Sequence, residues 1–229
     1  MFVAETGRKE GPAVLLLHAL GLDHRMWPQQ EAALAGEMRL LMPDLSGFGR
    51  SRLGEPGLEN SVEACAEHLK GLPSSAVVFG ISYGGYVAAM LAARYPDLVA
   101  GLALSGVRRS VPRPLAALQA GAFRLMPASE VSRGEVATSE ERAIEKNHLI
   151  EASLELGQID LRPVLSQIEA PTVVFAPARD WFVRREIPHV AGSIRGARIV
   201  SIPGAGHLWP QTYPLALTTA IRSLASRVG

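Results

Sequence analysis

The chain has 229 residues, which suits a single α/β domain with a small insertion and is long enough to bury a sizeable core. Its 23 Lys and Arg residues nearly balance 22 Asp and Glu residues, so the formal net charge is +1. A nucleic-acid or acidic-membrane partner normally requires a basic cluster, and the even charge balance argues against both.

Three further features bear on the cellular compartment. The one cysteine, Cys65, cannot form an internal disulfide, which is typical of a reducing compartment, although a disulfide-free secreted enzyme would look the same. Residues 1–5 lack the basic and apolar regions of a signal peptide. No stretch reaches the roughly 18 apolar residues that a membrane span needs. We therefore expect a cytoplasmic protein.

Short apolar runs alternate with helical patterns along the chain, which is typical of a mostly parallel sheet flanked by helices. Residues 2–5 leave room for one strand at the N-terminus. Runs such as Val14 to Leu17 are continuously apolar, the form of strands buried on both faces. Further along, the predicted strands are 13–17, 39–42, 76–80, 99–105, 171–176 and 198–202. The predicted helices are 28–36, 61–71, 83–94 and 213–227.

The alternation stops in residues 107–167, where the sequence becomes helical and more polar. Helical periodicity in 115–126 and 140–156 predicts two or three short helices. We interpret 107–167 as a lid inserted into a core domain formed by 1–106 and 168–229. A lid this small predicts a shallow to medium pocket, and lids of this kind exclude water and select substrates.

The most informative motif surrounds Ser82, which follows an apolar strand and precedes a helix-like segment. A serine hydroxyl is a weak nucleophile at neutral pH, so it needs exposure on a tight bend and a base within reach. Gly80 and Gly84 lie two residues before and after it, where larger side chains would crowd the turn. The spacing is that of a nucleophile elbow.

The partners that such a serine needs follow in the expected order, acid first and histidine last. Asp180 and His207 each lie in a loop after a β-branched strand. His207 would take the proton of Ser82 and return it to the leaving group, while Asp180 would orient the ring and stabilise the imidazolium. The backbone N–H groups of Leu20 and Tyr83 are the predicted oxyanion donors.

Four separated segments resemble the α/β-hydrolase family, and the resemblance covers nearly the whole chain. They are His18–Gly21, Pro43–Ser51, the elbow around Ser82, and Pro203–His207. The segment from His18 to Gln29 looks like the branch that contains esterases and enol-lactone hydrolases. The resemblance implies an α/β-hydrolase fold with a small helical cap.

Three positions depart from the family pattern. Ala19 stands where a glycine is usual, which would narrow the oxyanion pocket or redirect one donor. Residues 176–180 replace a glycine-containing turn before the acid, so Glu186 is the alternative acid. The N-terminus has room for one strand where the family often has two, so we expect a sheet trimmed at that edge.

The expected activity is that of a cofactor-free serine hydrolase acting on a small ester or lactone through an acyl-enzyme intermediate. No metal site is expected, and the protein would be a monomer or homodimer. Cleavage of a carbon–carbon bond or of an amide on the same residues stays open, because a fold alone does not separate these reactions. A ligand-binding relative that does not turn over substrate also stays open as an alternative.

Several other residues have two interpretations each. Trp181 and Trp209 flank the acid and the base, and they could wall an apolar pocket or pack in the core. Phe123 and Met126 of the lid could line the pocket or form an ordinary helix face. The arginines at the lid could meet a carboxylated substrate or cover a solvated surface; they are Arg108, Arg109, Arg113 and Arg124.

Two polar residues near the strand ends have structural interpretations. His18 directly follows a strand and is expected to be a hydrogen-bonded structural histidine rather than a proton carrier. Asp44 precedes the turn at 47–49, and its carboxylate is expected to hold that loop in place.

Overall fold

A computed structural model describes residues 1–131 and 138–226. Seven strands form one sheet in the order β1-β3-β2-β4-β5-β6-β7. The edge strand β1 runs antiparallel to β3, and the other neighbours are parallel. The strands are β1 Val3–Gly7, β2 Ala13–Leu17, β3 Arg39–Pro43, β4 Ala76–Ile81, β5 Val99–Ser105, β6 Thr172–Pro177 and β7 Arg198–Ile202. This confirms the predicted fold class, with one strand preceding β2.

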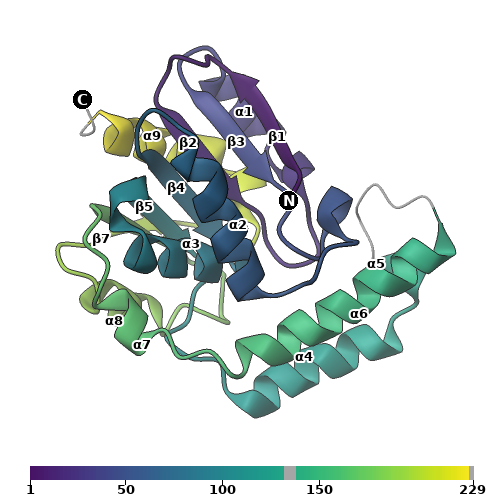
Figure 1. Ribbon diagram of the computed structural model, residues 1–229. Coiled ribbons are helices and arrows are strands. Elements are labelled where there is room, and N and C mark those ends of the chain that lie inside the picture. The colour runs from purple at the N-terminus through teal and green to yellow at the C-terminus, as the bar shows by residue number, and fades with distance from the viewer. Residues whose placement is uncertain (132–137, 227–229) are drawn as a thin grey trace.

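Helices cover both faces of the sheet (Figure 1). The helices α1 Pro28–Leu34 and α9 Pro214–Ala225 pack on one face. The other face carries α2 Leu58–Lys70, α3 Tyr83–Arg94 and α8 Ile187–Gly192. Between β5 and β6 lie α4 Arg113–Leu125, α5 Ala128–Val131, α6 Ser139–Leu156 and α7 Arg162–Leu165. In the described ranges, no helix has the length and apolar character needed to cross a bilayer.

The continuously apolar strands contribute side chains to two hydrophobic cores, one on each side of the sheet. Along β2, Leu15 and Leu17 enter the core beneath α2 and α3, while Val14 and Leu16 enter the core beneath α1 and α9. All four side chains are fully buried. Successive residues of a strand point to opposite faces, so a central strand covered on both sides must be apolar at every position.

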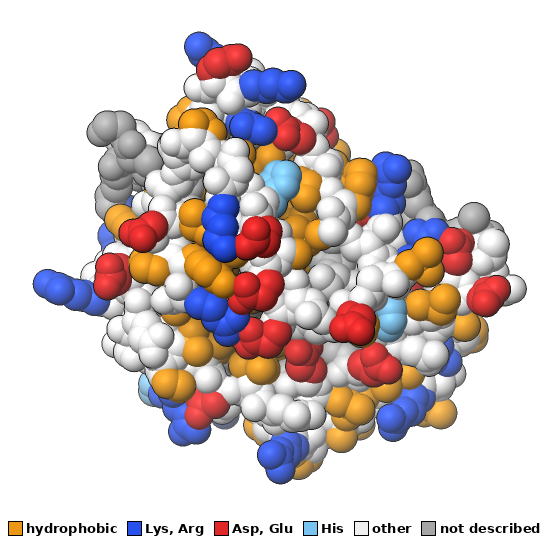
Figure 2. Space-filling view, viewed as in Figure 1, with side chains coloured by type: hydrophobic (Ala, Val, Ile, Leu, Met, Phe, Trp, Pro, Cys, Tyr) orange, Lys and Arg blue, Asp and Glu red, His pale blue; other side chains and the backbone are white. Residues whose placement is uncertain are grey.

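Charged side chains of both signs lie next to each other over the α2–α3 face (Figure 2). Arg94 pairs with Glu59 at 2.6 Å and with Glu63 at 2.8 Å. Lys70 pairs with Glu67 at 2.5 Å. This mixture of charges matches the nearly neutral net charge of the sequence.

The long helices of the predicted lid lie side by side (Figure 1). The two helices pack against each other, and Ala116 and Ala120 of α4 and Leu149 and Ala152 of α6 are buried. Thr138 begins α6 with a reciprocal capping box, a pattern that stabilises helix starts. The domain boundaries at 107–167 stay a prediction.

Polar contacts join α6 to the loop that precedes α2. Glu141 pairs with Arg52, and the Nδ1–H of His148 donates to the carbonyl of Gly47 at 2.8 Å. The backbone N–H of Leu58 donates to Glu155 Oε1 at 2.9 Å. The three α6 residues are seven positions apart, so they share one face of the helix.

Candidate active site

Ser82 lies on the turn between β4 and α3, and its backbone is strained. Its φ is 54° and its ψ is −121°, and among the described residues it is the one non-glycine residue with positive φ. A Cβ added to Gly80 would lie 2.2 Å from the carbonyl oxygen of Gly84. One added to Gly84 would lie 2.4 Å from the carbonyl oxygen of Leu17. The close approach of helix and strand therefore requires both glycines, and the turn presents the half-buried Ser82 side chain to the cavities next to it.

The predicted acid and base are in direct contact. Asp180 lies in the loop after β6 and His207 in the loop after β7, and His207 Nδ1 is 2.6 Å from Asp180 Oδ2. The Asp180 side chain is 3% exposed and that of His207 is 36% exposed. With Nδ1–H donating to the carboxylate, the other ring nitrogen is left to act as an acceptor.

The alternative acid, Glu186, has a different partner. Its carboxylate pairs with Arg109 at 3.1 Å. Burial acts to raise the pKa of Glu186, but the hydrogen bond and the charge of Arg109 outweigh it, so this pKa lies below its ordinary value. Within the described residues, no hydrogen bond or ion pair joins Glu186 to His207. The geometry favours Asp180 as the partner of the histidine.

Gly106 lets His207 lie next to Ser82. This glycine follows β5 with a φ of 68°, and an added Cβ would lie 2.9 Å from His207 Cε1 and 3.1 Å from the backbone nitrogen of Ser82. Both residues line the same two cavities. In the described part of the chain the Ser82 hydroxyl has no hydrogen bond. Hydrogen bonds between catalytic residues are often long or poorly aligned without substrate and tighten when substrate binds.

The loop after β2 is held against the elbow. The N–H of Gly84 donates to the carbonyl of His18 at 3.1 Å. The His18 ring is buried, donates from Nδ1 to the carbonyl of Ala19 at 2.9 Å and accepts at Nε2 from the N–H of Leu45 at 2.9 Å. Burial lowers the pKa of His18, so the neutral ring acts as a structural bridge, as expected.

The two predicted oxyanion donors flank the serine. Leu20 borders both cavities that Ser82 lines. Tyr83 is the first residue of α3, where a backbone N–H has no partner within the helix. The positions of both residues fit the predicted role, which stays a prediction.

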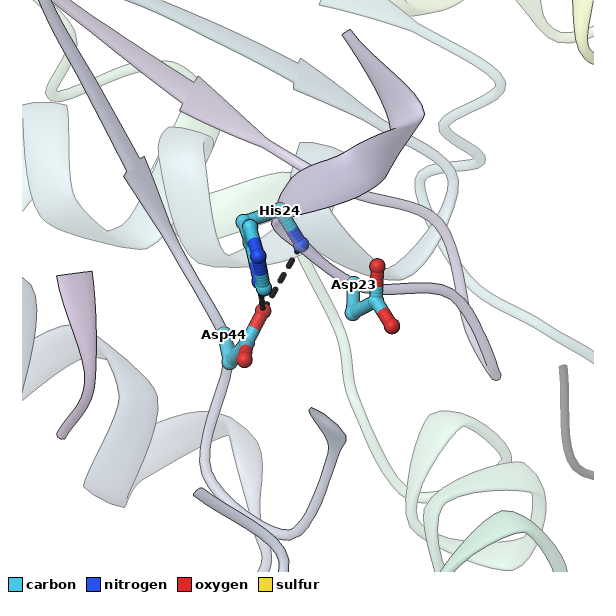
Figure 3. Close-up of side chains that lie close together, drawn as sticks. All are labelled: Asp23, His24 and Asp44. Carbon is cyan, nitrogen blue, oxygen red and sulfur yellow. Dashed lines mark hydrogen bonds and ion pairs between the residues drawn. The ribbon is translucent and has the colours of Figure 1, made fainter. Parts of the chain in front are cut away.

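Asp44 holds two loops together, as expected (Figure 3). Its Oδ1 accepts from the backbone N–H of His24 at 2.7 Å and from His24 Nδ1 at 2.7 Å. Its Oδ2 accepts from the N–H of Arg50 at 2.8 Å. The nearby carboxylate of Asp23 completes a group with the spacing of metal ligands, but Arg25 Nη2 already lies 2.7 Å from it. These hydrogen bonds account for the group as a structural one.

Two cavities meet at Ser82, His207, Leu20 and Gln119. The smaller has a volume of about 240 Å³, and Phe123 and Met126 of the lid line it. The larger has a volume of about 380 Å³ and a mostly apolar lining. Its walls include Val111, Leu115, Leu118, Ala122, Leu156, Trp181 and Phe182. Phe123, Met126 and Trp181 therefore lie where a bound substrate would contact them.

Of the two interpretations of Trp209, pocket wall or core residue, the structure favours the core residue. Its side chain is 1% exposed and borders neither of these cavities. The ring packs against Phe175 with centroids 4.6 Å apart and against Phe79 at 6.2 Å. Its Nε1–H donates to Ser105 Oγ at 2.8 Å. Trp209 is thus a core residue whose polar atom is satisfied by the end of β5.

The lid arginines divide into two kinds. Arg108 donates to the carbonyl of Phe182 and lies over its ring, with the guanidinium carbon 5.3 Å from the centroid. Together with the pair of Arg109 and Glu186, this contact ties the loop after Asp180 to the segment after β5. Arg113 and Arg124 are exposed. Binding of a charged substrate by these arginines stays a prediction.

Sequence reasoning did not identify Gln119 or Phe182, which also line the cavities. A signal for Gln119 was present, because it is the polar member of an otherwise apolar stripe in its helix. Phe182 follows Asp180 by two residues, and nothing in that loop indicates which way its ring points.

Comparison with known proteins shows the family. The model of the alpha/beta hydrolase family matches residues 14–220, and the chain belongs to this family. It is 29% identical over 225 residues to a pimeloyl-[acyl-carrier protein] methyl ester esterase of Edwardsiella ictaluri, with 85% of each chain covered. A thermophilic esterase structure from Thermogutta terrifontis is 30% identical, with a TM-score of 0.79 over 99% of this chain and 93% of that one.

A hydrolase structure from Pseudomonas aeruginosa is 28% identical, with a TM-score of 0.80 over 97% of this chain and 92% of that one. The enol-lactonase of Burkholderia xenovorans has the same fold, with a TM-score of 0.80 at 23% identity over 98% of this chain and 96% of that one. The family match and the relatives named as esterases or a hydrolase support esterase-type hydrolysis and an enzymatic role.

Proposed function

We propose that the protein is a serine hydrolase that cleaves a small carboxylic ester or lactone through an acyl-enzyme intermediate. One observation carries the proposal: Ser82 occupies a strained turn and lines the same cavities as His207, whose Nδ1 is 2.6 Å from the buried Asp180. Backbone strain at a serine is costly, and it persists where function needs the hydroxyl displayed.

The reaction follows from this arrangement. His207 accepts the proton of Ser82 as the hydroxyl oxygen attacks the carbonyl carbon, and Asp180 stabilises the imidazolium. The backbone N–H groups of Leu20 and Tyr83 bind the oxyanion, and the loss of one such donor costs about 3–4 kcal/mol of transition-state stabilisation. The imidazolium then protonates the leaving alkoxide as its bond to carbon breaks. Water, activated by His207, hydrolyses the acyl-enzyme and regenerates the hydroxyl of Ser82.

The cavity sizes support a small substrate. The cavities of about 240 Å³ and 380 Å³ both open on Ser82, so an ester could place its scissile bond there with one group on each side. Relatives are named as an esterase, an enol-lactonase and a methyl ester esterase, which supports esters and lactones as the substrate class. A cytoplasmic location and a monomeric or homodimeric state stay predictions.

The test is a time course of p-nitrophenyl acetate and butyrate hydrolysis with a phosphonate as active-site titrant. We expect multiple turnover and stoichiometric labelling of the wild type. Ser82→Ala should abolish labelling and reduce turnover by about 10⁴-fold or more, because residues that act as one unit are lost together. Retained turnover in Ser82→Ala would refute the nucleophile.

A pair of variants separates the two carboxylates. Asp180→Asn should reduce turnover by up to about 10⁴-fold by favouring the wrong histidine tautomer. Glu186→Gln keeps the shape of a residue that pairs with Arg109, so it should reduce turnover far less. The reverse order would assign the acid to Glu186. Turnover of an amide or a β-diketone in preference to esters would move the enzyme to another reaction class, and labelling without any turnover would indicate a ligand-binding protein.

A further inference from the structure

One face of α4 forms the roof over Ser82. The residues of this helix and its end that border the two cavities are Leu115, Leu118, Gln119, Ala122, Phe123 and Met126. Their spacing of three and four positions places them on one side of the helix. Five of the six are apolar, and Gln119 is the polar exception in the middle of the stripe.

Gln119 lies where the two cavities join. It borders both of them, together with Ser82, His207 and Leu20. The neighbouring Ala116 and Ala120 are buried and α4 packs against α6, so a rotation of the helix that carried position 119 away from the cavities would expose both alanines. Gln119 therefore stays at the border of the space that Ser82 and His207 also line.

The amide of Gln119 has no hydrogen-bond partner among the residues that the structure describes, and its side chain is half-buried. An amide offers two N–H donors and a carbonyl acceptor. A bound substrate that displaces water from these atoms without replacing the hydrogen bonds loses binding energy, since unpaired polar groups are costly to desolvate. A substrate with a matching polar group avoids this loss.

We propose that Gln119 is a specificity-determining residue that hydrogen-bonds a hydroxyl or carbonyl group of the substrate next to the scissile bond. The inference rests on the proposed hydrolysis at Ser82 and narrows its substrate class. Esters and lactones that carry an additional hydroxyl or carbonyl group next to the scissile bond are preferred over alkyl esters of the same size without that group. Sites that hydrogen-bond a substrate group discriminate against analogues that lack it.

The test compares kcat/KM for ethyl butyrate, ethyl 3-hydroxybutyrate and ethyl acetoacetate. One neutral hydrogen bond predicts a preference of about threefold to tenfold for an oxygen-bearing ester in the wild type. Gln119→Met keeps the length of the side chain and removes the amide, so the ratio of kcat/KM between a hydroxyl- or carbonyl-bearing ester and ethyl butyrate should fall to about one. Gln29→Leu, at an exposed position of α1, is the matched control and should leave the preference intact.

A binding measurement separates this inference from the proposed function. The Ser82→Ala variant, with and without Gln119→Met, is titrated with the three esters by ligand-observed NMR. Tighter binding of an oxygen-bearing ester that depends on Gln119 supports the inference even if turnover is absent. Equal binding of all three esters, or a preference that survives Gln119→Met, overturns it. Failure of the wild type to hydrolyse any ester counts against the proposed function alone.

Discussion

Glu155 of α6 connects the predicted lid to the residue that follows the nucleophile. Its Oε2 accepts from the hydroxyl of Tyr83 at 3.1 Å, and its Oε1 accepts from the N–H of Leu58 at 2.9 Å. Burial raises the pKa of Glu155, and the nearby charge of Glu59 acts in the same direction. The ionised carboxylate thus satisfies two donors at the expense of its own desolvation.

The two roles of Glu155 predict opposite effects for two substitutions. Glu155→Ala leaves the Tyr83 hydroxyl and the Leu58 N–H without their acceptor, and each unsatisfied buried group costs about 1–3 kcal/mol of stability. Glu155→Gln keeps an acceptor for Leu58 and places an N–H₂ group beside the Tyr83 oxygen without the charge. At pH 7 Glu155→Gln should therefore be at least as stable as the wild type, and Glu155→Ala less stable by about 2–6 kcal/mol.

The sign of the pH dependence follows from the raised pKa. Between the ordinary value near 4.5 and the higher folded pKa, the native state binds more protons at Glu155 than the unfolded state does. The free energy of unfolding therefore falls as pH rises through this window and becomes flat above it. Relative to Glu155→Gln, the wild type should gain stability as pH is lowered from 7 towards 4.5.

Urea unfolding at several pH values between about 4.5 and 8 measures these differences through the midpoint and the slope. The comparison of wild type with Glu155→Gln isolates one carboxyl group, because all other titrating groups are shared. A wild type that loses stability relative to Glu155→Gln on acidification would refute the raised pKa. An Ala variant as stable as the wild type would show that the two donors are satisfied in another way.

Two further predictions concern the elbow and the cysteine. Gly84→Ala forces a Cβ to within 2.4 Å of the Leu17 carbonyl and should cost about 1–3 kcal/mol or more, with loss of activity. At Gly121 an added Cβ would have nothing within 4 Å, so Gly121→Ala should instead stabilise α4 by about 0.5–1 kcal/mol. Thermal unfolding compares the two variants, and equal effects on stability would contradict the steric explanation. Burial raises the pKa of Cys65 to about 12, so a thiol reagent at pH 8 should label it only after unfolding. Rapid labelling of the native protein would contradict this.

The strands could be predicted from sequence because their burial leaves a local record. Apolar runs predicted 13–17 and 99–105 with the bounds that the structure has. The segment 198–202 was also predicted with the correct bounds, but from its β-branched residues, because most of this edge strand is exposed. The start of α2 could not be located in this way. The prediction began the helix at 61, whereas it begins at Leu58, because the donor of Leu58 is capped by Glu155 from a helix 97 residues further along the chain.

The difference between local sequence signals and contacts between distant segments also explains which residues of the candidate site could be predicted. The elbow carries its own signal in the glycines two residues on each side of Ser82, although the contact that requires Gly84 comes from Leu17 of β2 and not from the turn itself. Trp209 and Trp181 looked equivalent beside the base and the acid, yet one is 1% exposed and the other 81% exposed. The difference depends on which loop lies over the core, and Ser105 at the end of β5 binds the indole of Trp209. Such a contact joins residues 104 positions apart and leaves no trace in either segment.

The polar attachment of α6 has a consequence for specificity. Glu141, His148 and Glu155 fix the helix to the loop at 47–58 by hydrogen bonds and an ion pair, while its apolar residues pack on α4. Hydrogen bonds are directional, so three of them along one face define where the helix lies more narrowly than apolar contact does. The position of α4, and with it the distance of Gln119 from Ser82, therefore depends on this polar row. Substitutions at Glu141 or His148 should therefore shift substrate preference, although neither side chain lines the two cavities.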